Sequence, residues 1–253
     1  MNSKCGLFLQ PPSVRPKDDI RLAALLSLRA VLLRFQEISD ITSQELQNVT
    51  TLAQVLTPNA ATDNAIVIPG GPTLSYAALS NEIERVAGVL AAAGVEAGRP
   101  VSIVLANNLE FMITFLAVAR AGAIAAPLNS AYTVDEFKFF MEDAEAQLAI
   151  VPPGDHAGRD SANQLNIPTM DASSTHVVIA RNGSELTLTK DVAGPSEDDV
   201  ALFLHTSGTT NRPKGVPLTH KNLLTSLGNI KDTYALTPDD VAMVVMPLFH
   251  VHG

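Results

Sequence analysis

The sequence predicts an α/β protein in which stacked, largely parallel sheets are flanked by helices. From about Thr51 onward, short β-branched and apolar runs alternate with longer segments of helical spacing, which is typical of strand–helix crossover units. The chain has 253 residues, of which 46% are hydrophobic and 17% are charged. A chain of this size and composition can bury a substantial core, so we expect a folded, globular domain.

The first 48 residues differ from the rest, so we divide the chain into an N-terminal extension, 1–48, and a main domain, 49–253. Within the extension, Arg21–Phe35 is rich in leucine and contains spaced arginines, which favours a helix. An organelle-targeting helix is one interpretation, although the nearby acids Asp18 and Asp19 are unusual in a transit peptide. A helical or loosely ordered extension is the other.

The first helix of the main domain is predicted from four apolar residues that share one helical face. Leu79, Ile83, Val86 and Leu90 have the required spacing, and Gly94 follows where a left-handed residue ends many helices. The sequence therefore predicts an amphipathic helix that stops at this glycine.

A strand, a helix and a second strand are expected next. Val101–Leu105 is a short β-branched run, which favours a strand. Helical spacing continues from about Leu109 to Ala121, where Gly122 provides a stop. Ala123–Pro127 then has the composition of a buried strand.

The firmest helix start lies at Thr133. Thr133 and Glu136 have the spacing of a capping box, in which both side chains satisfy free backbone amides at the start of a helix. The helix that follows is expected to bury Phe137, Phe140 and Met141.

The middle of the chain is predicted to contain a strand, a loop and short hairpins. Leu148–Val151 is a continuous apolar run and therefore a strand. Pro152–Asp160 is rich in glycine, proline and aspartate, which favours a loop. Between Gln164 and Gly194 the apolar runs are short, so we expect small strands or hairpins there.

Two strands and one helix are expected in the last third. Val200–His205 is an apolar run that predicts a buried strand, and Val241–Met246 is interpreted as a further central strand. Thr219 can cap a helix between them. The inner face of that helix is expected to carry Leu223, Leu224, Leu227 and Ile230.

Composition excludes several classes of function. The formal net charge is −9 and no dense Lys/Arg run is present, which argues against nucleic-acid binding and an anionic membrane surface. The longest apolar stretch, Phe111–Leu128, is interrupted by Arg120 and Gly122, so no membrane span is expected. No signal-peptide pattern opens the chain. The single cysteine, Cys5, can form no intrachain disulfide, which favours a reducing compartment.

A loop of hydroxyls, glycines and cations follows the strand at Val200–His205. Residues 206–215 have the sequence TSGTTNRPKG. Glycines allow backbone N–H groups to approach phosphate oxygens, hydroxyls donate hydrogen bonds, and Lys214 or Arg212 offsets negative charge. A Walker A loop is excluded, because Pro213 precedes the lysine and an extended segment follows it. The alternatives are a polyphosphate-binding loop and a polar surface loop whose glycines only serve turns.

Longer motifs around this loop resemble the adenylate-forming superfamily, which includes acyl-CoA synthetases, luciferases and peptide-synthetase adenylation domains. LFLHTSGTTNRPKGVPLTHKNL at Leu202–Leu223 resembles its signature loop, and MPLFHVHG at Met246–Gly253 resembles its next motif. NNLEF at Asn107–Phe111 and APLNSAYTVDEF at Ala126–Phe137 are most similar to the oxalyl-CoA synthetase-like branch. The resemblance covers about Thr51–Gly253.

The resemblance implies a carboxylate–CoA ligase that uses ATP and Mg²⁺, with CoA as cosubstrate and a small carboxylic acid such as oxalate as substrate. His250 would line the acyl pocket as a gate or hydrogen-bond donor. The residues implied to bind the ATP phosphates are Thr206, Ser207, Gly208, Thr209, Thr210 and Lys214.

The remaining histidines near the loop are assigned other roles. His205 stands where the family often has tyrosine, which favours packing, and His220 opens a helix, where a hydrogen-bonding role is expected. Their spacing fits no compact zinc site, so no metal ligand is assigned. Asn211 replaces a usual glycine, and asparagine tolerates the left-handed backbone angles such a turn needs.

The resemblance also implies an incomplete version of the family's N-terminal region, because motifs for the adenine pocket, the acidic Mg²⁺ ligand and the hinge are absent. Two hypotheses follow: part of an acyl-CoA ligase, or a catalytically inactive, partner-binding fragment. An uncovered apolar face is expected in either case. Cytoplasm is the default compartment, and a peroxisomal address would be a C-terminal tripeptide. The oligomeric state stays open.

Overall fold

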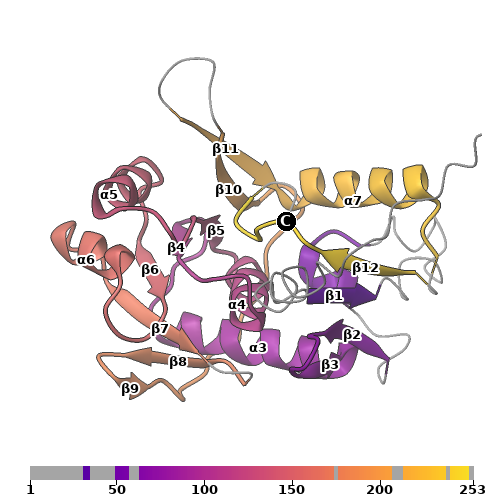
Figure 1. Ribbon diagram of the computed structural model, residues 1–253, viewed down its shortest axis with the longest axis horizontal. Coiled ribbons are helices and arrows are strands. Elements are labelled where there is room, and N and C mark those ends of the chain that lie inside the picture. Colours follow the sequence, from indigo (N-terminus) through magenta and orange to yellow (C-terminus); the bar gives the residue numbers. More distant parts are fainter. Residues whose placement is uncertain are drawn as a thin grey trace, which may run out of the picture.

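A computed structural model describes residues 31–34, 49–56, 63–173, 176–206, 213–237 and 240–250. Figure 1 shows two sheets with helices packed around them. The helices are η2 (Leu52–Leu56), α3 (Tyr76–Ala92), α4 (Leu109–Arg120), α5 (Val134–Asp143), α6 (Ala157–Gln164) and α7 (His220–Tyr234).

The larger sheet of the described residues has eight strands in the order β11-β10-β5-β4-β6-β7-β8-β9. The four pairs from β10 to β7 are parallel, and the pairs at both ends of the sheet are antiparallel. The predicted α/β class is confirmed, and this sheet is mixed, with the parallel pairs at the centre. The strands are β4 (Pro100–Ile103), β5 (Ile124–Pro127), β6 (Leu148–Val151), β7 (Thr169–Ser173), β8 (Val178–Arg181), β9 (Ser184–Glu185), β10 (Val200–Thr206) and β11 (Lys214–Thr219).

The smaller sheet is antiparallel throughout its described strands, which lie in the order β12-β1-β2-β3. It packs next to α3, which contacts both β2 and β3. Its strands are β1 (Val31–Arg34), β2 (Asn64–Val67), β3 (Thr73–Ser75) and β12 (Val241–Val244).

Helices cover both faces of the larger sheet at its centre. Leu148 and Ile150 of β6 belong to a core cluster with α3 and α4, whereas Ala149 and Val151 belong to a second cluster with α5 and α6. Successive side chains of a strand point to opposite faces, so this strand is buried on both. That arrangement explains its continuous apolar sequence and places α3 and α5 on opposite sides of the sheet (Figure 1).

The first three predicted helices are confirmed, together with the capping box at Thr133 and the two glycines predicted to end helices. Asn108 caps α4, and Thr133 and Glu136 form the complete capping box of α5. Such a cap typically stabilises a helix by about 1 kcal/mol. Gly94 and Gly122 follow α3 and α4 with φ values of 93° and 75°, a region that favours glycine.

The loop predicted at Pro152–Asp160 is wrong at its end, because α6 begins at Ala157. Few apolar residues mark this helix, and polar contacts stabilise its start. The His156 side chain accepts a backbone N–H bond in the first turn at 3.0 Å. Arg159 donates to backbone oxygens of the preceding loop. The helix therefore lacks the apolar period from which helices are predicted in sequence.

The N-terminal prediction also needs correction. The helix expected over Arg21–Phe35 is wrong for Val31–Arg34, which forms β1 between β12 and β2; the rest of that range lies outside the described residues. An apolar run without a clear period fits helix or strand, and here the two neighbouring strands pair with its backbone groups. The boundary at residue 48 stays a prediction.

The last helix and the last strand, α7 and β12, are more exposed to solvent than expected. The central strand predicted at Val241–Met246 is wrong in its position, because β12 is an edge strand of the smaller sheet. Ile230 on α7 is 44% exposed rather than on an inner face. Here burial depends on partners that a local pattern cannot specify. The large apolar side chains exposed on and beside these two elements are Ile230, Tyr234, Val241, Met243, Val245 and Met246.

We expect the chain to bind a hydrophobic dye and to self-associate as its concentration rises, because these side chains lie close together in sequence and face solvent. Met243, which is 61% exposed, is the test position. Met243→Lys should lower both signals in dye titration and sedimentation velocity. Leu188→Lys is the matched control, since Leu188 is 80% exposed but is flanked by threonines. A monomer that binds no dye would contradict the expectation.

Candidate functional site

The hydroxyl-rich loop joins two antiparallel strands, β10 and β11. Its two ends are adjacent: Thr206 pairs with Lys214 across the hairpin, and the Thr206 hydroxyl lies 3.5 Å from the Lys214 carbonyl oxygen. Both residues are exposed. The structure thus brings together two of the residues predicted to bind phosphate; Ser207, Gly208, Thr209 and Thr210, with Asn211 and Arg212, lie outside the described residues. A strand follows the loop, as expected for a loop that is not a Walker A motif.

An aromatic side chain fixes the base of this hairpin. Gly215 pairs with His205, and a Cβ built on Gly215 would lie 2.3 Å from the Phe203 ring. The ring of Phe203 therefore lies directly over the glycine. It also meets the His205 ring edge-on, with the centroids 5.2 Å apart.

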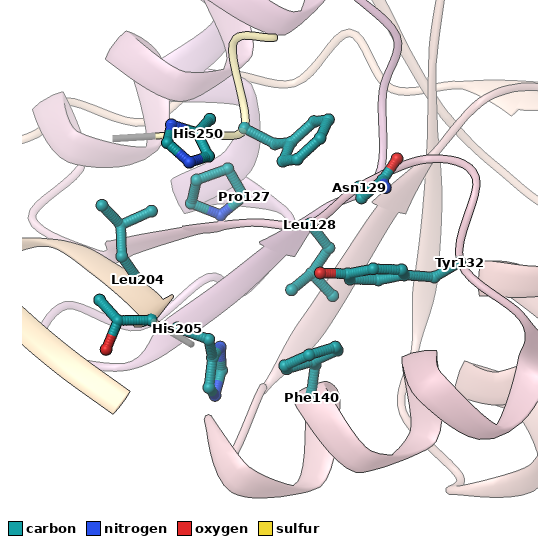
Figure 2. A pocket seen from close by; sticks show the side chains of 10 residues that line it. Pro127, Leu128, Asn129, Tyr132, Phe140, Leu204, His205 and His250 are labelled. Carbon is teal, nitrogen blue, oxygen red and sulfur yellow. The ribbon is translucent and has the colours of Figure 1, made fainter. Parts of the chain in front are cut away.

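A cavity of about 260 Å³ lies where β5 and β10 end, next to the hairpin (Figure 2). Parallel strands place their carboxyl ends at one edge of a sheet, where α/β proteins commonly bind ligands. The wall combines apolar and polar side chains. The lining residues are Pro127, Leu128, Asn129, Tyr132, Phe140, Leu204, His205, Thr206, Phe249 and His250.

Tyr132 and Phe140 form the aromatic wall of the cavity. Their rings stack with centroids 4.8 Å apart. Figure 2 shows the Tyr132 hydroxyl directed toward the middle of the group of side chains. Burial, together with the nearby Glu136 carboxylate, raises the pKa of Tyr132, so the hydroxyl stays protonated and can donate a hydrogen bond.

Sequence reasoning assigned no site role to Asn129, Tyr132 or Phe140. All three lie within or just after the APLNSAYTVDEF motif, which carries a family resemblance but no assigned role. The signal that could have identified them is the sheet topology: this motif includes the end of β5, a parallel neighbour of β10. Two such strand ends share one edge, so residues just after each can line one cavity.

His205 has the packing role expected of it. It pairs through Nε2 with the Asp143 carboxylate at 3.1 Å, and its side chain is 7% exposed. The Phe140 ring lies edge-on to it at 4.7 Å. Burial lowers the pKa of His205, although Asp143 acts in the opposite direction. The contact joins β10 to the end of α5 beside the cavity.

His250 lies on the cavity wall close to Pro127 (Figure 2). Its backbone N–H donates to the Pro247 carbonyl oxygen at 3.0 Å, which closes a turn at the end of the described chain. Its predicted role in the acyl pocket stays a prediction.

His220 is buried and 1% exposed, at the start of α7. Its Nδ1 accepts the backbone N–H of Leu52 at 3.2 Å, so the expected hydrogen-bonding role joins segments far apart in sequence. Among the described residues, no group of three or more His, Cys, Asp or Glu is placed to hold a metal ion. No helix in the same part of the chain is long and apolar enough to cross a membrane.

We expect the chain to lose stability as pH falls from about 7 to 5.5. Burial is the largest cause that lowers the pKa of His156, His205 and His220 below the ordinary 6.5. Around pH 6.5 the unfolded chain therefore binds more protons than the folded chain. The histidines' contribution is complete above pH 6.5 and is lost as pH falls through their lower folded pKa values.

Urea midpoints at pH 7.5 and 5.5 measure this loss above the ordinary range of carboxyl groups. His220→Gln should reduce the difference between the two midpoints, because glutamine does not titrate. A midpoint that is unchanged or higher at pH 5.5 would contradict the assignment.

Comparisons with known proteins agree with this architecture. A probable CoA ligase, CCL9, from Humulus lupulus is 44% identical over 196 residues, covering 75% of this chain and 37% of that protein. An oxalate–CoA ligase from Arabidopsis thaliana is 43% identical over 196 residues, covering 75% and 38%. The chain thus spans less than two fifths of the length of these relatives.

Solved structures show the same fold. MatB from Rhodopseudomonas palustris matches with a TM-score of 0.67 without ligand and 0.66 with ATP bound, at 28% and 30% identity. Each match covers 81% of this chain and 41% of MatB. The fold is therefore that of the N-terminal part of an adenylate-forming enzyme. Residues 57–253 match the family described as AMP-binding enzyme, and the chain belongs to that family.

Proposed function

We propose that the chain is the phosphate-binding part of an ATP-dependent carboxylate–CoA ligase. The observation that carries this proposal is the β10–β11 hairpin, which places Thr206 and Lys214 together beside a cavity lined by His250. A hairpin rich in hydroxyls and glycines supplies many N–H and O–H donors to a polyphosphate. The ATP-bound state of MatB, a structural neighbour, supports ATP as the ligand.

In the proposed reaction, a substrate carboxylate attacks the α-phosphate of ATP and pyrophosphate leaves, which gives an acyl-adenylate. The CoA thiol then displaces AMP and forms the thioester. The protein's part is positioning and charge stabilisation. The proposed phosphate ligands are Thr206, Ser207, Gly208, Thr209, Thr210 and Lys214.

Mg²⁺ would enter with the nucleotide. Magnesium usually keeps several waters and binds through substrate phosphates with one or two carboxylates. The exposed hydroxyl of Thr206 is the type of oxygen donor that fits such a hydrated ion. When bound, the ion would offset charge on the phosphates.

The proposed substrate is a small carboxylic acid of the oxalate type. A cavity of about 260 Å³ suits a small acid, and donors such as the Tyr132 hydroxyl and the His250 ring can bind a carboxylate. The oxalate–CoA ligase of Arabidopsis, 43% identical over the shared region, supports the same class. Cytoplasm is the proposed compartment, with the peroxisome as the alternative for a longer form.

A partner-binding, non-catalytic role is the second candidate. The apolar side chains exposed on α7 and β12 favour it, because such surfaces commonly bind other proteins. It is compatible with the family assignment, since a binding fragment can retain the fold.

Acid-dependent release of pyrophosphate from MgATP separates the two candidates. Oxalate, malonate and coumarate are offered in parallel to the 253-residue chain, with a no-acid control. Release with oxalate above the other acids supports the ligase and its substrate class. No release with any acid contradicts catalysis by this chain and favours the partner-binding role.

A further inference from the structure

Asn107 contacts the segment that carries His250 through both polar atoms of its side chain. Its Oδ1 accepts the backbone N–H of Leu248 at 2.8 Å, and its Nδ2 donates to the carbonyl oxygen of Met246 at 3.3 Å. The two residues are 139 and 141 positions away in sequence. One amide side chain thus pairs with two backbone groups of a distant segment.

The sequence of that segment explains why a side chain is needed. Pro247 has no N–H, so a regular strand ladder cannot continue through it. Beyond Val244 the described chain leaves β12, and the Asn107 amide pairs with groups on either side of the proline. A primary amide has the same donor and acceptor as a peptide unit, so it can replace a strand partner at this point.

The turn from Pro247 to His250 connects the segment that Asn107 holds to the cavity. The Pro247 carbonyl oxygen accepts the N–H of His250. This turn therefore begins at Pro247, which lies between the two residues that Asn107 contacts. Leu248 and Phe249 also pack against the core cluster of α3 and α4. Phe249 and His250 are the two cavity-lining residues that this segment supplies.

Asn107 itself lies at the same edge of the sheet as the cavity, although it is not one of the lining residues. It follows β4, which pairs in parallel with β5, the strand that ends at Pro127. The adjacent Asn108 has a different role, because its Oδ1 accepts the N–H of Phe111 at 2.9 Å and caps α4. The two neighbouring asparagines therefore have different roles: Asn108 caps a helix, whereas Asn107 contacts the segment that carries His250.

We propose that Asn107 is a positioning residue that holds residues 246–250, and with them His250, against the substrate cavity. The position of residues 246–250 is inferred from the two hydrogen bonds of Asn107. The effect on substrate binding rests on the proposed function. Asn107 touches no reacting atom in this assignment. It acts through the backbone of Met246 and Leu248.

The decisive pair of variants is Asn107→Asp and Asn108→Asp, which make the same charge change at adjacent residues. Aspartate at position 107 keeps the acceptor for Leu248 but loses the donor and brings a negative charge to the Met246 carbonyl. Aspartate at position 108 caps a helix as well as asparagine does. Asn107→Asp should therefore release the segment, and Asn108→Asp should not.

Amide hydrogen exchange of the 253-residue chain, followed by NMR, tests the position without any ligand. We expect Leu248 and His250 to exchange about ten-fold faster in Asn107→Asp, because the hydrogen bond to the Met246 carbonyl oxygen is lost and the new carboxylate repels that oxygen, and at the original rate in Asn108→Asp. Unchanged exchange in Asn107→Asp would overturn the proposal, whether or not the chain binds any acid.

Titration with oxalate in the presence of MgATP tests the link to substrate. Asn107→Asp should raise the Kd for oxalate about ten-fold and leave the Kd for ATP unchanged, a split that general destabilisation would not produce. Faster exchange with an unchanged oxalate Kd overturns the substrate link. If the original chain binds no oxalate, the proposed substrate class fails, and the exchange comparison still decides the positioning role.

Discussion

Lys214→Ala is expected to weaken ATP binding by about 10- to 100-fold, the effect of removing a charge-assisted hydrogen bond to phosphate. Lys214 is exposed at the base of the hairpin, opposite Thr206, so its ammonium group can reach a ligand there without a cost of burial. In a chain that releases pyrophosphate, the same change should lower the rate by about 10²- to 10³-fold if the lysine also stabilises charge in the transition state.

Thr209→Ala should weaken binding in the same direction by a smaller factor, because it removes a neutral donor. Lys190→Ala is the matched control, since it removes one positive charge from a loop outside the site. Calorimetric titration of the 253-residue chain with MgATP measures all three variants. An equal loss in Lys190→Ala would mean that net charge, and not the hairpin, governs affinity. Full affinity in Lys214→Ala would remove this lysine from the site.

The sequence predicts the fold best where one local signal is sufficient. Thr133 and Glu136 fix the start of α5 because both partners of the capping box lie within one turn. The apolar run Leu148–Val151 matches β6 because this strand is buried on both faces. In each case the residues themselves contain the information that decides the structure.

The prediction fails where distant partners decide. Val31–Arg34 is a strand because β12 and β2 lie on either side of it, and no local period indicates those neighbours. At the candidate site, Thr206 and Lys214 were predicted together because a motif joins them along the chain. Tyr132 and Asn107 were not predicted because the partners that bring them to the site, such as His205 and Leu248, are far away in sequence. Motifs identify contiguous loops well, whereas a cavity wall needs the topology of the sheet.

Gly215→Ala is expected to destabilise the chain by about 1 kcal/mol, the lower end of the range for adding a methyl group against a neighbouring side chain, because Gly215 is exposed and Phe203 is only half-buried. The new Cβ would lie 2.3 Å from the Phe203 ring and within 3.1 Å of two further ring atoms, so the ring must move. Phe203 also contacts His205, whose pairing with Asp143 joins β10 to α5. Displacing the ring should therefore disturb both the base of the hairpin and the cavity wall.

Gly228→Ala is the matched control, because no atom lies within 4 Å of a Cβ built at that position in the middle of α7. Alanine there should stabilise the chain by about 0.5–1 kcal/mol, since it is the better helix former. Urea denaturation measures both changes. The double variant Phe203→Leu with Gly215→Ala should recover part of the lost stability, because leucine is smaller than phenylalanine and leaves room for the new methyl group. If Gly215→Ala is as stable as the original chain, the packing of Phe203 does not fix the hairpin, and the geometry proposed for Thr206 and Lys214 loses its structural support.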